Sequence, residues 1–531
     1  MAPLITSNFV DYCFLFFIWI VSNLMVRFLI KTCTNSRATA RNPPSPLALP
    51  IIGHLHLLSH SLPKSLQNLA RRHGPLMQIR FGATTFIIAS NAAVAREMLK
   101  THDVDFASRF EFGPSNYNIY SGAGFVTCAN SSYWRFMKKL CMTKLFAGPQ
   151  LDRFNSIRVE EVEKLLKSLL KSSGEGEACD LEAELTTLTN NLMCRMALSK
   201  RCSADDATGA KEIRKLVVEI MQLAAKIGVN DVFGPLRKFD LFGHGKRLVE
   251  GLWRYDRFFE QIMKEYEDNM GGGAAGHGKE AADLMTIVLE TYNDTNAEVK
   301  ITRNQIKFFF IELFMASVDT LSAGIQWAMA EIINHPQVFK KLRDEINMAV
   351  GSSRLVKQSD VPNLPYLQAV VKESLRLHSP APLIFRQSTK DCKINGFDVK
   401  AKTKTMINAY AIMRDPEYWN DPDEFIPERF LVNSDDNLGQ HQMEIKGQDF
   451  RYLPFGGGRR GCIGGTHAVL VTQVTLGALI QCFDWKVKDG EKIDIKGASG
   501  FAGAMSLPLV CYPITRFDPF SATMKFPRNG A

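Results

Sequence analysis

Apolar positions divide the chain into one N-terminal apolar segment and a long body of helical patterns. Residues 12–30 are apolar except for Ser22, Asn23 and Arg27. A helix of this length reaches about 28 Å, which is close to the hydrocarbon thickness of a bilayer. The segment therefore predicts a transmembrane helix, with a cleaved signal peptide as the alternative interpretation.

The order of charges around this segment favours the membrane anchor. No Lys or Arg precedes the segment, whereas Arg27, Lys31, Arg37 and Arg41 lie within it or follow it. Positive charge stays on the cytosolic side of a membrane, so this order leaves the C-terminal body in the cytosol. Residues 1–11 are then expected in the lumen, and the anchor is expected to contact membrane lipid.

A linker is predicted at residues 31–53, and a single mainly helical domain at residues 54–531. Four prolines between positions 43 and 50 remove backbone donors and hold the linker extended. Within the domain, two short apolar runs at 76–80 and 85–89 predict a β-hairpin. The predicted helices lie at 93–100, 133–145, 156–171, 181–197, 210–227, 247–269 and 305–333.

The pattern at 305–333 is the most apolar of the long helices. Apolar side chains surround it almost completely, so we expect it to cross the middle of the core. It nevertheless contains Glu312, Ser317, Asp319 and Thr320. Polar groups in a buried helix cost free energy unless they are paired. These four residues therefore either serve packing specificity or carry a function.

Composition and charge exclude several classes of protein. Apolar residues make up 46% and charged residues 22%, which excludes a disordered or fibrous chain. The net charge of +9 is mild for 531 residues, and no block of Lys or Arg indicates a nucleic-acid partner. The eleven cysteines include no CxxC pair, so a disulfide framework and a zinc ribbon are poor interpretations. We expect free thiols that serve as small core residues in a reducing compartment.

Cys462 stands apart from the other cysteines. Six of the ten residues from 456 to 465 are glycine, and a backbone of this kind can approach a flat group closely. The cysteine falls just ahead of an apolar helical pattern, where backbone N–H groups favour a thiolate. A phosphate loop is the competing interpretation, but no Lys-Ser/Thr pair follows the glycines. With Arg459 and Arg460 alongside, the thiolate suits a haem iron and its propionates.

Residues 455–464 read Phe-x-x-Gly-x-Arg-x-Cys-x-Gly and resemble the haem-binding signature of the cytochrome P450 monooxygenases. In chain order, residues 316–320 resemble the family's oxygen-activation motif, 373–376 its ExxR motif and 427–430 its PERF motif. The anchor and the proline-rich linker resemble those of microsomal plant members. The resemblance spans essentially the whole chain. It implies the mainly α cytochrome P450 fold: a large helical domain, a small β-rich N-terminal subdomain and a transmembrane helix in the endoplasmic reticulum membrane.

The resemblance also implies the cofactor, haem b (iron protoporphyrin IX). Cys462 would be the axial ligand of the iron. Lys138 stands where the family usually has Arg, so its contact would be a point charge rather than a two-pronged one. The remaining haem-binding residues implied by the resemblance are Trp134, Arg386, Phe455 and Arg460.

Two further groups of residues take roles from the resemblance. Asp319 and Thr320 match the acid–alcohol pair that delivers protons during dioxygen activation. Ser317 stands where Gly is usual, and it either fills part of the oxygen groove or holds a water. Glu373 and Arg376 are three apart on one helical pattern and therefore share a face. By resemblance, Arg429 joins them in a buried triad that braces the fold behind the cysteine loop.

The reaction implied by the family is monooxygenation: dioxygen is split, one oxygen atom enters a C–H bond and the other leaves as water. Electrons would come from NADPH through a membrane flavoprotein reductase, which Lys138, Lys139 and Arg459 could attract. A membrane-tethered haem sensor or binding protein and a haem-thiolate isomerase that accepts hydroperoxides remain alternatives. The acid–alcohol pair argues against both, because neither needs proton delivery.

The expected substrate pocket is apolar. Such a pocket suits a large hydrocarbon skeleton better than a polyphenol, whose hydroxyl groups need partners. Residues 133–143 and 507–513 resemble plant A-type enzymes near the flavonoid oxidases, in a group that includes triterpenoid oxidases. We therefore predict a pentacyclic triterpene of the friedelin type, hydroxylated at a methyl group, with a flavonoid or isoflavonoid hydroxylase as the alternative. The expected lining residues are Met315, Val318, Leu383, Ile384, Ala502, Ala504 and Met505.

Overall fold

The structure is a computed structural model in which most of the body is described and most of the first 40 residues are not. Of the predicted anchor at 12–30, only Ile18, Trp19 and Ser22 are described, and they are helical and exposed. The anchor and residues 1–11 otherwise lie outside the described residues. The described residues are 18, 19, 22, 41–110, 117, 119–120, 122–146, 148–201, 210–230, 240, 243–271, 283–431, 443–490, 492–495, 497 and 503–521.

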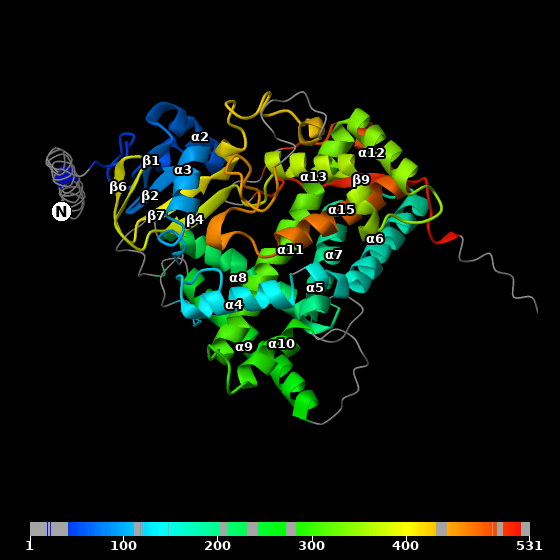
Figure 1. Ribbon diagram of the computed structural model, residues 1–531, viewed down its shortest axis with the longest axis horizontal. Coiled ribbons are helices and arrows are strands. Elements are labelled where there is room, and N and C mark those ends of the chain that lie inside the picture. The colour runs from blue at the N-terminus through cyan, green and yellow to red at the C-terminus, as the bar shows by residue number, and fades with distance from the viewer. Residues whose placement is uncertain are drawn as a thin grey trace, which may run out of the picture.

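A small sheet lies at one end of the molecule, beside helices α2 (Leu62–His73) and α3 (Ala92–Arg96) (Figure 1). Its strand order is β1-β2-β7-β4. The predicted hairpin is confirmed, because β1 pairs with β2 antiparallel and Leu76 lies opposite Ala89. The sheet also confirms the predicted β-rich subdomain, although half of its strands come from the second half of the chain. The strands are β1 (Leu76–Phe81), β2 (Thr84–Ala89), β4 (Leu383–Gln387) and β7 (Lys404–Asn408).

Part of the predicted linker runs along this sheet. The amide of Gln78 on β1 donates to the carbonyl of Pro44 at 2.7 Å, and Gly53 forms a bridge with Phe81. A side chain on Gly53 would lie within 2.4 Å of the Arg80 carbonyl oxygen, so this close approach requires glycine. The proline-rich segment is therefore held against the body from Pro44 onward.

Helices form most of the rest of the body, which confirms the mainly α prediction. Each predicted helix is present within a few residues of its expected ends, and the helix expected at 93–100 consists of α3 followed by a π-helix at Glu97–Thr101. The remaining helices are α4 (Ser132–Lys144), α5 (Gly148–Arg153), α6 (Asn155–Glu175), α7 (Leu181–Leu198), α8 (Ala210–Asn230), α9 (His244–Gly271), α10 (Leu284–Asn293), α11 (Arg303–Asn334), α12 (Pro336–Ala349), α13 (Pro365–Leu377), α14 (Ala409–Ile412) and α15 (Gly465–Cys482).

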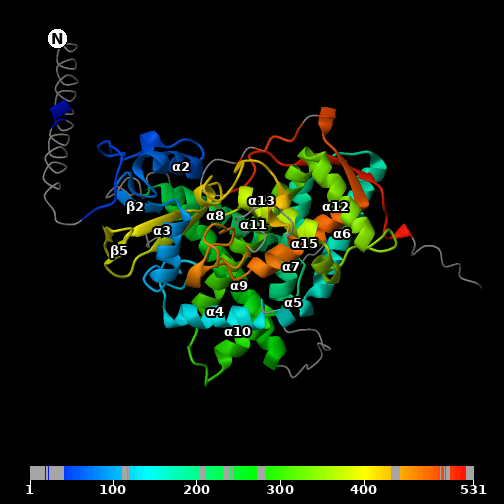
Figure 2. The ribbon, with the colours of Figure 1, turned by 45° about the horizontal axis from the view of Figure 1, so that its top comes forward.

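Helix α11 crosses the middle of the molecule, as its apolar pattern predicts (Figures 1 and 2). A capping box starts it: the Thr302 hydroxyl accepts from the amide of Gln305, and the Gln305 side chain accepts from the amide of Thr302. Pro336 then begins the next helix. Among the described helices, α11 alone is long and apolar enough to cross a membrane, but 61% of its most apolar stretch is buried within the protein.

Two apolar clusters meet on α11. One contains its first half up to Val318, with side chains of α4, α7, α8 and α9. The other contains its second half from Leu321 onward, with side chains of α6, α12, α13 and α15. Asp319 and Thr320 lie where the two clusters join, so these two polar residues occupy a break in the core rather than its interior.

Two smaller sheets lie outside the four-stranded sheet. Strand β9 (Val510–Thr515) pairs with β3 (Cys179–Asp180) and β8 (Phe483–Lys486), and β5 (Cys392–Ile394) pairs with β6 (Phe397–Val399).

Most of the described cysteines have free thiols, as expected. These are Cys128, Cys141, Cys179, Cys392, Cys462, Cys482 and Cys511. The expectation is wrong for Cys194, which is disulfide-bonded. A disulfide depends on the separation of two thiols in space, which the spacing of cysteines in the sequence does not reveal.

Candidate functional site

The glycine-rich run folds into a tight loop that presents Cys462 just before α15. The amide of Cys462 donates to the carbonyl of Phe455 at 3.0 Å, which closes the loop. Its thiol is exposed, yet protein atoms surround it on most sides, as at the bottom of a recess. Burial raises the pKa of this thiol, while the amides of Gly464 and Gly465 and the charge of Arg109 lower it. These donors favour the thiolate once a metal binds it.

Glycine is required at several positions of this loop. Gly456 and Gly458 have φ values of 70° and 67°, which other residues adopt at a cost. A side chain on Gly458 would lie 2.6 Å from both the Leu99 carbonyl and the Asp103 carboxylate. The loop therefore packs directly on the segment that follows α3. Because its glycines have no side chains, the loop leaves room for a flat ligand close to the backbone around the thiol.

Arg460 is held beside the loop by backbone oxygens and an aromatic ring. Its guanidinium lies 4.0 Å from the centre of the Trp134 ring. Lys138 lies 5.4 Å from the same ring and donates to the carbonyl of Arg459. The predicted haem-binding residues of α4 thus meet Arg460 in one place. The carbonyls that accept from Arg460 belong to Ala107, Phe125 and Cys128.

Two more arginines lie next to Arg460, Arg386 buried and Arg109 half-buried. Arg386 is 1% exposed and donates to the carbonyl of Gly457 at 3.3 Å. Arg109, which the sequence pattern does not single out, donates to the carbonyl of Arg460 at 3.5 Å, and its Nε has no partner among the described residues. Burial lowers the pKa of Arg109 to about 10, and the charge of Arg460 acts in the same direction. Burial, followed by the charges of Arg109 and Arg460, also lowers the pKa of Arg386.

These three arginines, which we call the arginine cluster (Arg109, Arg386 and Arg460), fit the carboxylates of a haem. Within the described residues, none of the three forms an ion pair with a carboxylate. Buried cations without a counter-charge are costly, so an anionic group placed among them would be strongly stabilised. The propionates of haem supply such groups beside a flat ring. The recessed thiol, the glycine loop and the arginine cluster together match the shape and charge of that cofactor.

The middle of α11 is open on one face. Ala316, Asp319 and Thr320 are exposed, whereas the helix is buried before and after them. Ala316 and Thr320 are one turn apart on the same face, and the Thr320 hydroxyl donates to the Ala316 carbonyl at 2.6 Å. The hydroxyl of Ser317 donates to the carbonyl of Leu313 at 2.7 Å, so it is engaged within the helix. The predicted acid–alcohol pair therefore borders open space in the centre of the protein.

Glu312 is one of the polar residues of α11 that need hydrogen-bond partners in a buried helix, and the structure supplies these partners. Its carboxylate accepts hydrogen bonds from the amides of Phe125, Val126 and Thr127 at 2.5, 2.9 and 3.3 Å. Burial raises its pKa to about 7, while these backbone donors lower it. A side chain at Gly124 would lie 2.4 Å from the Thr127 hydroxyl. The loop before α4 is thus fixed to α11, and the same loop supplies carbonyls to Arg460.

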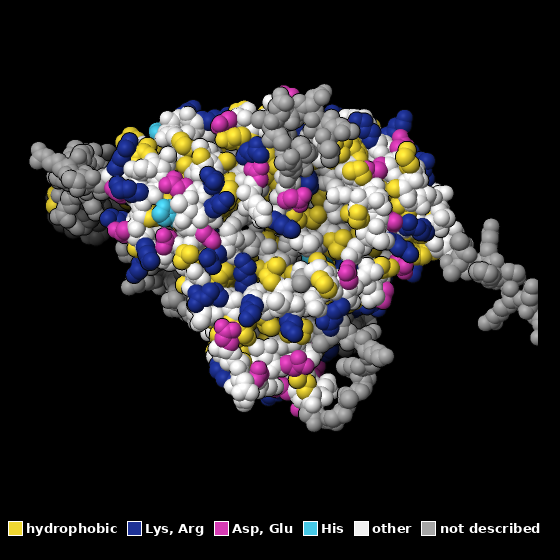
Figure 3. Space-filling model, viewed as in Figure 1, with side chains coloured by type: hydrophobic (Ala, Val, Ile, Leu, Met, Phe, Trp, Pro, Cys, Tyr) yellow, Lys and Arg dark blue, Asp and Glu magenta, His cyan; other side chains and the backbone are white. Residues whose placement is uncertain are grey.

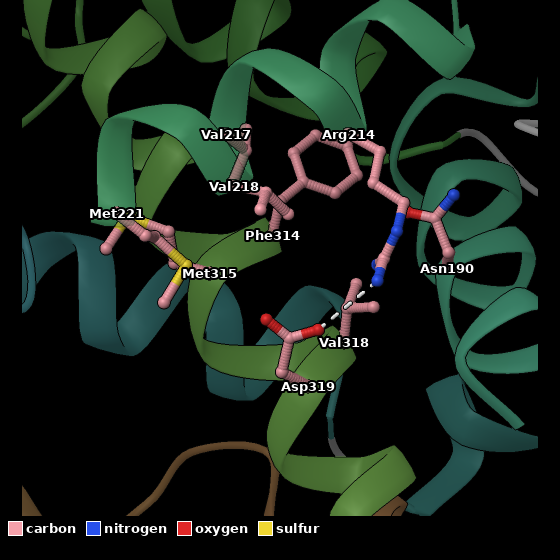
Figure 4. Close-up of a pocket in the computed structure, with 9 residues that line it drawn as sticks. All are labelled: Asn190, Arg214, Val217, Val218, Met221, Phe314, Met315, Val318 and Asp319. Carbon is pink, nitrogen blue, oxygen red and sulfur yellow. Dashed lines mark hydrogen bonds and ion pairs between the residues drawn. The ribbon is translucent and has the colours of Figure 1, made fainter. Parts of the chain in front are cut away.

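Met315 and Val318, two of the predicted substrate residues, line a small cavity between α8 and α11 (Figure 4). Apolar side chains of α8 and α11 form most of the wall. Asp319 also borders this cavity and forms an ion pair with Arg214 of α8, with 3.5 Å between Nη2 and Oδ1. The sequence does not single out Arg214, because its partner lies 105 residues away.

The other predicted substrate residues are spread over several places. Ile384 lies beside the cysteine loop, 3.8 Å from where a Cβ on Gly456 would stand. Leu383 and Met505 pack into two separate apolar clusters. Ala504 is half-buried, and Ala502 lies outside the described residues.

The ExxR pair is fully buried and forms a network with Arg429. Arg376 donates to both carboxylate oxygens of Glu373 at 2.7 and 2.8 Å, and Arg429 donates to one of them at 3.2 Å. The hydroxyl of Tyr452, at the start of the cysteine loop, donates to the carbonyl of Lys372 beside this network. Arg376 also donates to the carbonyls of Met413, Pro422 and Glu424.

Basic side chains gather over α4 on the face that Figure 3 shows. Arg135, Lys139 and Lys144 are exposed, and Lys138 is half-buried. Arg459 is half-exposed and pairs with Asp103 at 3.1 Å. The surface over α4 is therefore a basic patch next to the cysteine loop, which suits an acidic protein partner.

Comparison with known proteins finds similarity over nearly the whole length of the chain. The family model described as Cytochrome P450 matches residues 43–511. The chain is 40% identical over 487 residues to 3,9-dihydroxypterocarpan 6A-monooxygenase of Glycine max, covering 90% of this chain and 94% of that one. It is 38% identical over 514 residues to Beta-amyrin 24-hydroxylase of Glycine max, covering 96% and 99%. It is 41% identical over 482 residues to Cytochrome P450 705A12 of Arabidopsis thaliana, covering 90% and 92%.

Proposed function

The chain belongs to the cytochrome P450 family, and we propose that it hydroxylates a pentacyclic triterpene of the friedelin type. As a member of this family it is a haem-thiolate monooxygenase of plant specialised metabolism. It uses dioxygen and electrons that pass from NADPH through a reductase. Successive oxidation of the same methyl group to the acid is part of the proposal.

The apolar character of the predicted substrate residues supports this substrate class. Met315 and Val318 lie on the apolar side of the small cavity between α8 and α11, and Ile384 lies beside the cysteine loop. None of these side chains carries a charge or an amide. A rigid hydrocarbon skeleton loses little by entering such surroundings, whereas each unpaired phenol would cost free energy. The similarity to Beta-amyrin 24-hydroxylase, whose named substrate is a triterpene, supports the same class.

A flavonoid or isoflavonoid hydroxylase is the second candidate. The similarity to 3,9-dihydroxypterocarpan 6A-monooxygenase favours it, since the named substrate of that relative is an aromatic compound with two hydroxyl groups. A membrane-tethered haem sensor is not favoured by any relative reported above.

Cys462 carries the proposal for the site. Its thiolate would bind the haem iron, with hydrogen bonds from the amides of Gly464 and Gly465 to stabilise the sulfur charge. Haem bound in this way supplies the chemistry that splits dioxygen and inserts one oxygen atom into a C–H bond. Phe455 accepts the hydrogen bond that closes the loop around the thiol. The single observation that carries this proposal is the recessed thiol next to an arginine cluster that has no carboxylate partner among the described residues.

The remaining site residues bind, orient or move protons. Arg386 and Arg460, with Trp134 and Lys138, would neutralise the propionates and fix the orientation of the ring. Asp319 and Thr320 would pass protons from solvent toward the open face of α11. The triad of residues 373, 376 and 429 would keep the cysteine loop in place through its contacts with the segment 413–424.

The proposed cellular arrangement follows from the N-terminal sequence and the basic patch. Residues 12–30 would anchor the protein in the endoplasmic reticulum membrane, with the domain at 54–531 in the cytosol. The basic patch over α4 would receive the acidic surface of the reductase. Salt should therefore slow electron transfer from the reductase.

Expression of the full chain in microsomes with a plant reductase tests the function. We would supply friedelin, β-amyrin, a dihydroxypterocarpan and an isoflavone in separate assays, and identify products by mass spectrometry. A friedelin product that gains one oxygen atom only when NADPH is present supports the proposal. The same product in the Cys462→Ser variant would contradict the thiolate ligand. Oxidation of the phenolic compounds alone would establish the second candidate.

A further inference from the structure

The small cavity between α8 and α11 has a polar end made by three side chains. Asn190 of α7, Arg214 of α8 and Asp319 of α11 contribute these groups, while Met221 and Met315 lie at the opposite end (Figure 4). The free volume is about 10 Å³, roughly what one water molecule needs. A cavity of this size with three polar neighbours suits a single ordered water.

Asn190 is the unusual member of this group. Its side chain is 5% exposed, and no residue that the structure describes donates to its amide or accepts from it. A buried amide without a hydrogen-bond partner is unfavourable. The neighbouring Asn191 shows the ordinary arrangement, because its amide donates to the Glu161 carboxylate at 3.1 Å. Asn190 therefore has unused hydrogen-bonding capacity that faces the cavity.

Helix α7 holds Asn190 in a fixed position against α11. The Thr189 hydroxyl donates to the carbonyl of Val318 at 3.1 Å, immediately before Asp319. One turn earlier, the hydroxyls of Thr186 and Ser322 lie 3.0 Å apart. Rigid support of this kind is typical of residues that position a reacting group.

We propose that Asn190, Arg214 and Asp319 bind one water molecule that supplies protons to the Asp319 carboxylate. This inference rests on the proposed role of Asp319 in proton delivery. The Asn190 amide orients the water, and Arg214 holds the carboxylate through its ion pair. The water gives a proton to the Asp319 oxygen and regains one from bulk solvent, so no oxidant or reductant enters the step. Asn190 and Arg214 are positioning residues, since they act through Asp319.

The ion pair beside the cavity is accessible to water, because Arg214 is about one third exposed and Asp319 about half exposed. Val217, Val218 and Phe314 lie between the polar group and the methionines (Figure 4). A water bound here would exchange with solvent while the substrate stays on the apolar side.

A high-resolution crystal structure of the holoenzyme tests the binding of water directly. We expect one ordered water within hydrogen-bond distance of the Asn190 amide, Arg214 and Asp319. The water should be absent from the Asn190→Leu variant, in which an apolar side chain of similar shape replaces the amide. An empty cavity, or a water bound equally in both proteins, would overturn the inference without reference to any substrate.

Turnover measurements test the role of that water, with friedelin and β-amyrin as probes. In the Asn190→Leu variant we expect product formed per NADPH to fall about fivefold or more, with hydrogen peroxide released instead. The spectral dissociation constant of the probe should change less than about twofold. The Asn190→Ser variant keeps a hydroxyl for the water and should recover most of the yield. Asn191→Leu is the matched control, because it makes the same change on the α6 side of α7 and should leave the yield unchanged.

The Asp319→Asn variant separates this inference from the proposed function. If Asp319→Asn lowers the yield and Asn190→Leu does not, the water is not the proton source and only the inference fails. If neither substitution changes the yield, the proposed role of Asp319 fails as well. Weaker probe binding by Asn190→Leu with an unchanged yield would show that the cavity contacts the substrate, which also overturns the inference.

Discussion

The carboxylate of Glu312 accepts a hydrogen bond of 2.9 Å from the amide of Val126, although 186 residues separate them in the chain. This contact joins α11 to the loop before α4. Two carbonyls of the same loop, those of Phe125 and Cys128, accept from Arg460. Glu312 is therefore connected to the arginine cluster through a few backbone atoms, and a change in its charge should reach the haem-binding side of the site.

The first prediction concerns pH. Burial raises the pKa of Glu312 from 4.5 to about 7, so the folded protein binds this proton more tightly than the unfolded chain. The stability contributed by the protonated group is complete below pH 4.5 and is lost as the pH rises to about 7. Its loss should lower the free energy of unfolding by about 3 kcal/mol over that range. The Glu312→Gln side chain cannot ionise, so the free energy of unfolding of this variant should lack this dependence on pH.

Urea unfolding, followed by haem absorbance at several pH values between 4.5 and 7.5, measures the difference. The wild-type midpoint should fall relative to that of Glu312→Gln as the pH rises. Parallel midpoints for the two proteins would show that Glu312 ionises normally and that its backbone donors outweigh burial.

The second prediction concerns retention of the cofactor. Arg109 is half-buried, its Nε is buried without a partner among the described residues, and it lies against Arg460, so a propionate should be its main stabilising partner. Arg109→Leu should therefore bind haem at least about tenfold more weakly, a loss typical of a buried charge-assisted hydrogen bond. The rate at which haem transfers from the protein to apomyoglobin measures how fast the cofactor is lost.

Arg343→Leu is the matched control for Arg109. Arg343 is buried, and it pairs with Asp484 and with backbone carbonyls away from the cysteine loop. Its replacement should lower overall stability and leave the rate of haem transfer, measured under folding conditions, close to that of the wild type. Equal acceleration in both variants would assign Arg109 a structural role only.

The third prediction concerns the triad. Glu373 is fully buried and shares its oxygens between Arg376 and Arg429. Glu373→Gln leaves two buried guanidinium groups without a counter-charge and should cost about 3–5 kcal/mol of stability. Thermal unfolding of the haem protein measures this loss. Asp360→Asn weakens a surface ion pair with the exposed Arg354 and should cost less than about 1 kcal/mol. A similar cost for both substitutions would contradict a bracing role for the triad.

Local spacing in the sequence explains which parts of this structure could be predicted. The period of apolar residues places α11 and marks its polar residues as exceptions, and the three-residue spacing of Glu373 and Arg376 places them on one face. The glycine run with Cys462 fixes the chemistry of one loop. Each of these features depends on residues that are close in the chain, where geometry follows from the helix or turn itself.

Contacts between distant segments could not be predicted in this way. Arg109 acquires its importance from Val126 and Arg460, and neither is marked by any spacing from it. Asn190 and Asn191 look alike in the sequence, yet a rotation of one residue turns the first toward α11 and the second toward α6. Half of the small sheet likewise comes from residues 383–408, which pair with the N-terminal hairpin only after the chain has folded.

The last prediction concerns Thr320. Its hydroxyl lies on the open face of α11, where it donates to the Ala316 carbonyl at 2.6 Å. If the hydroxyl passes protons toward that face, Thr320→Ala should lower the product formed per NADPH about tenfold while substrate binding changes little. The missing electrons should appear as hydrogen peroxide. Ser322→Ala is the control on the same helix, because its hydroxyl faces Thr186 of α7 instead of the open side. A normal yield in Thr320→Ala, or an equal loss in both variants, would remove Thr320 from the proton route, because the two hydroxyls differ mainly in the face of α11 that they occupy.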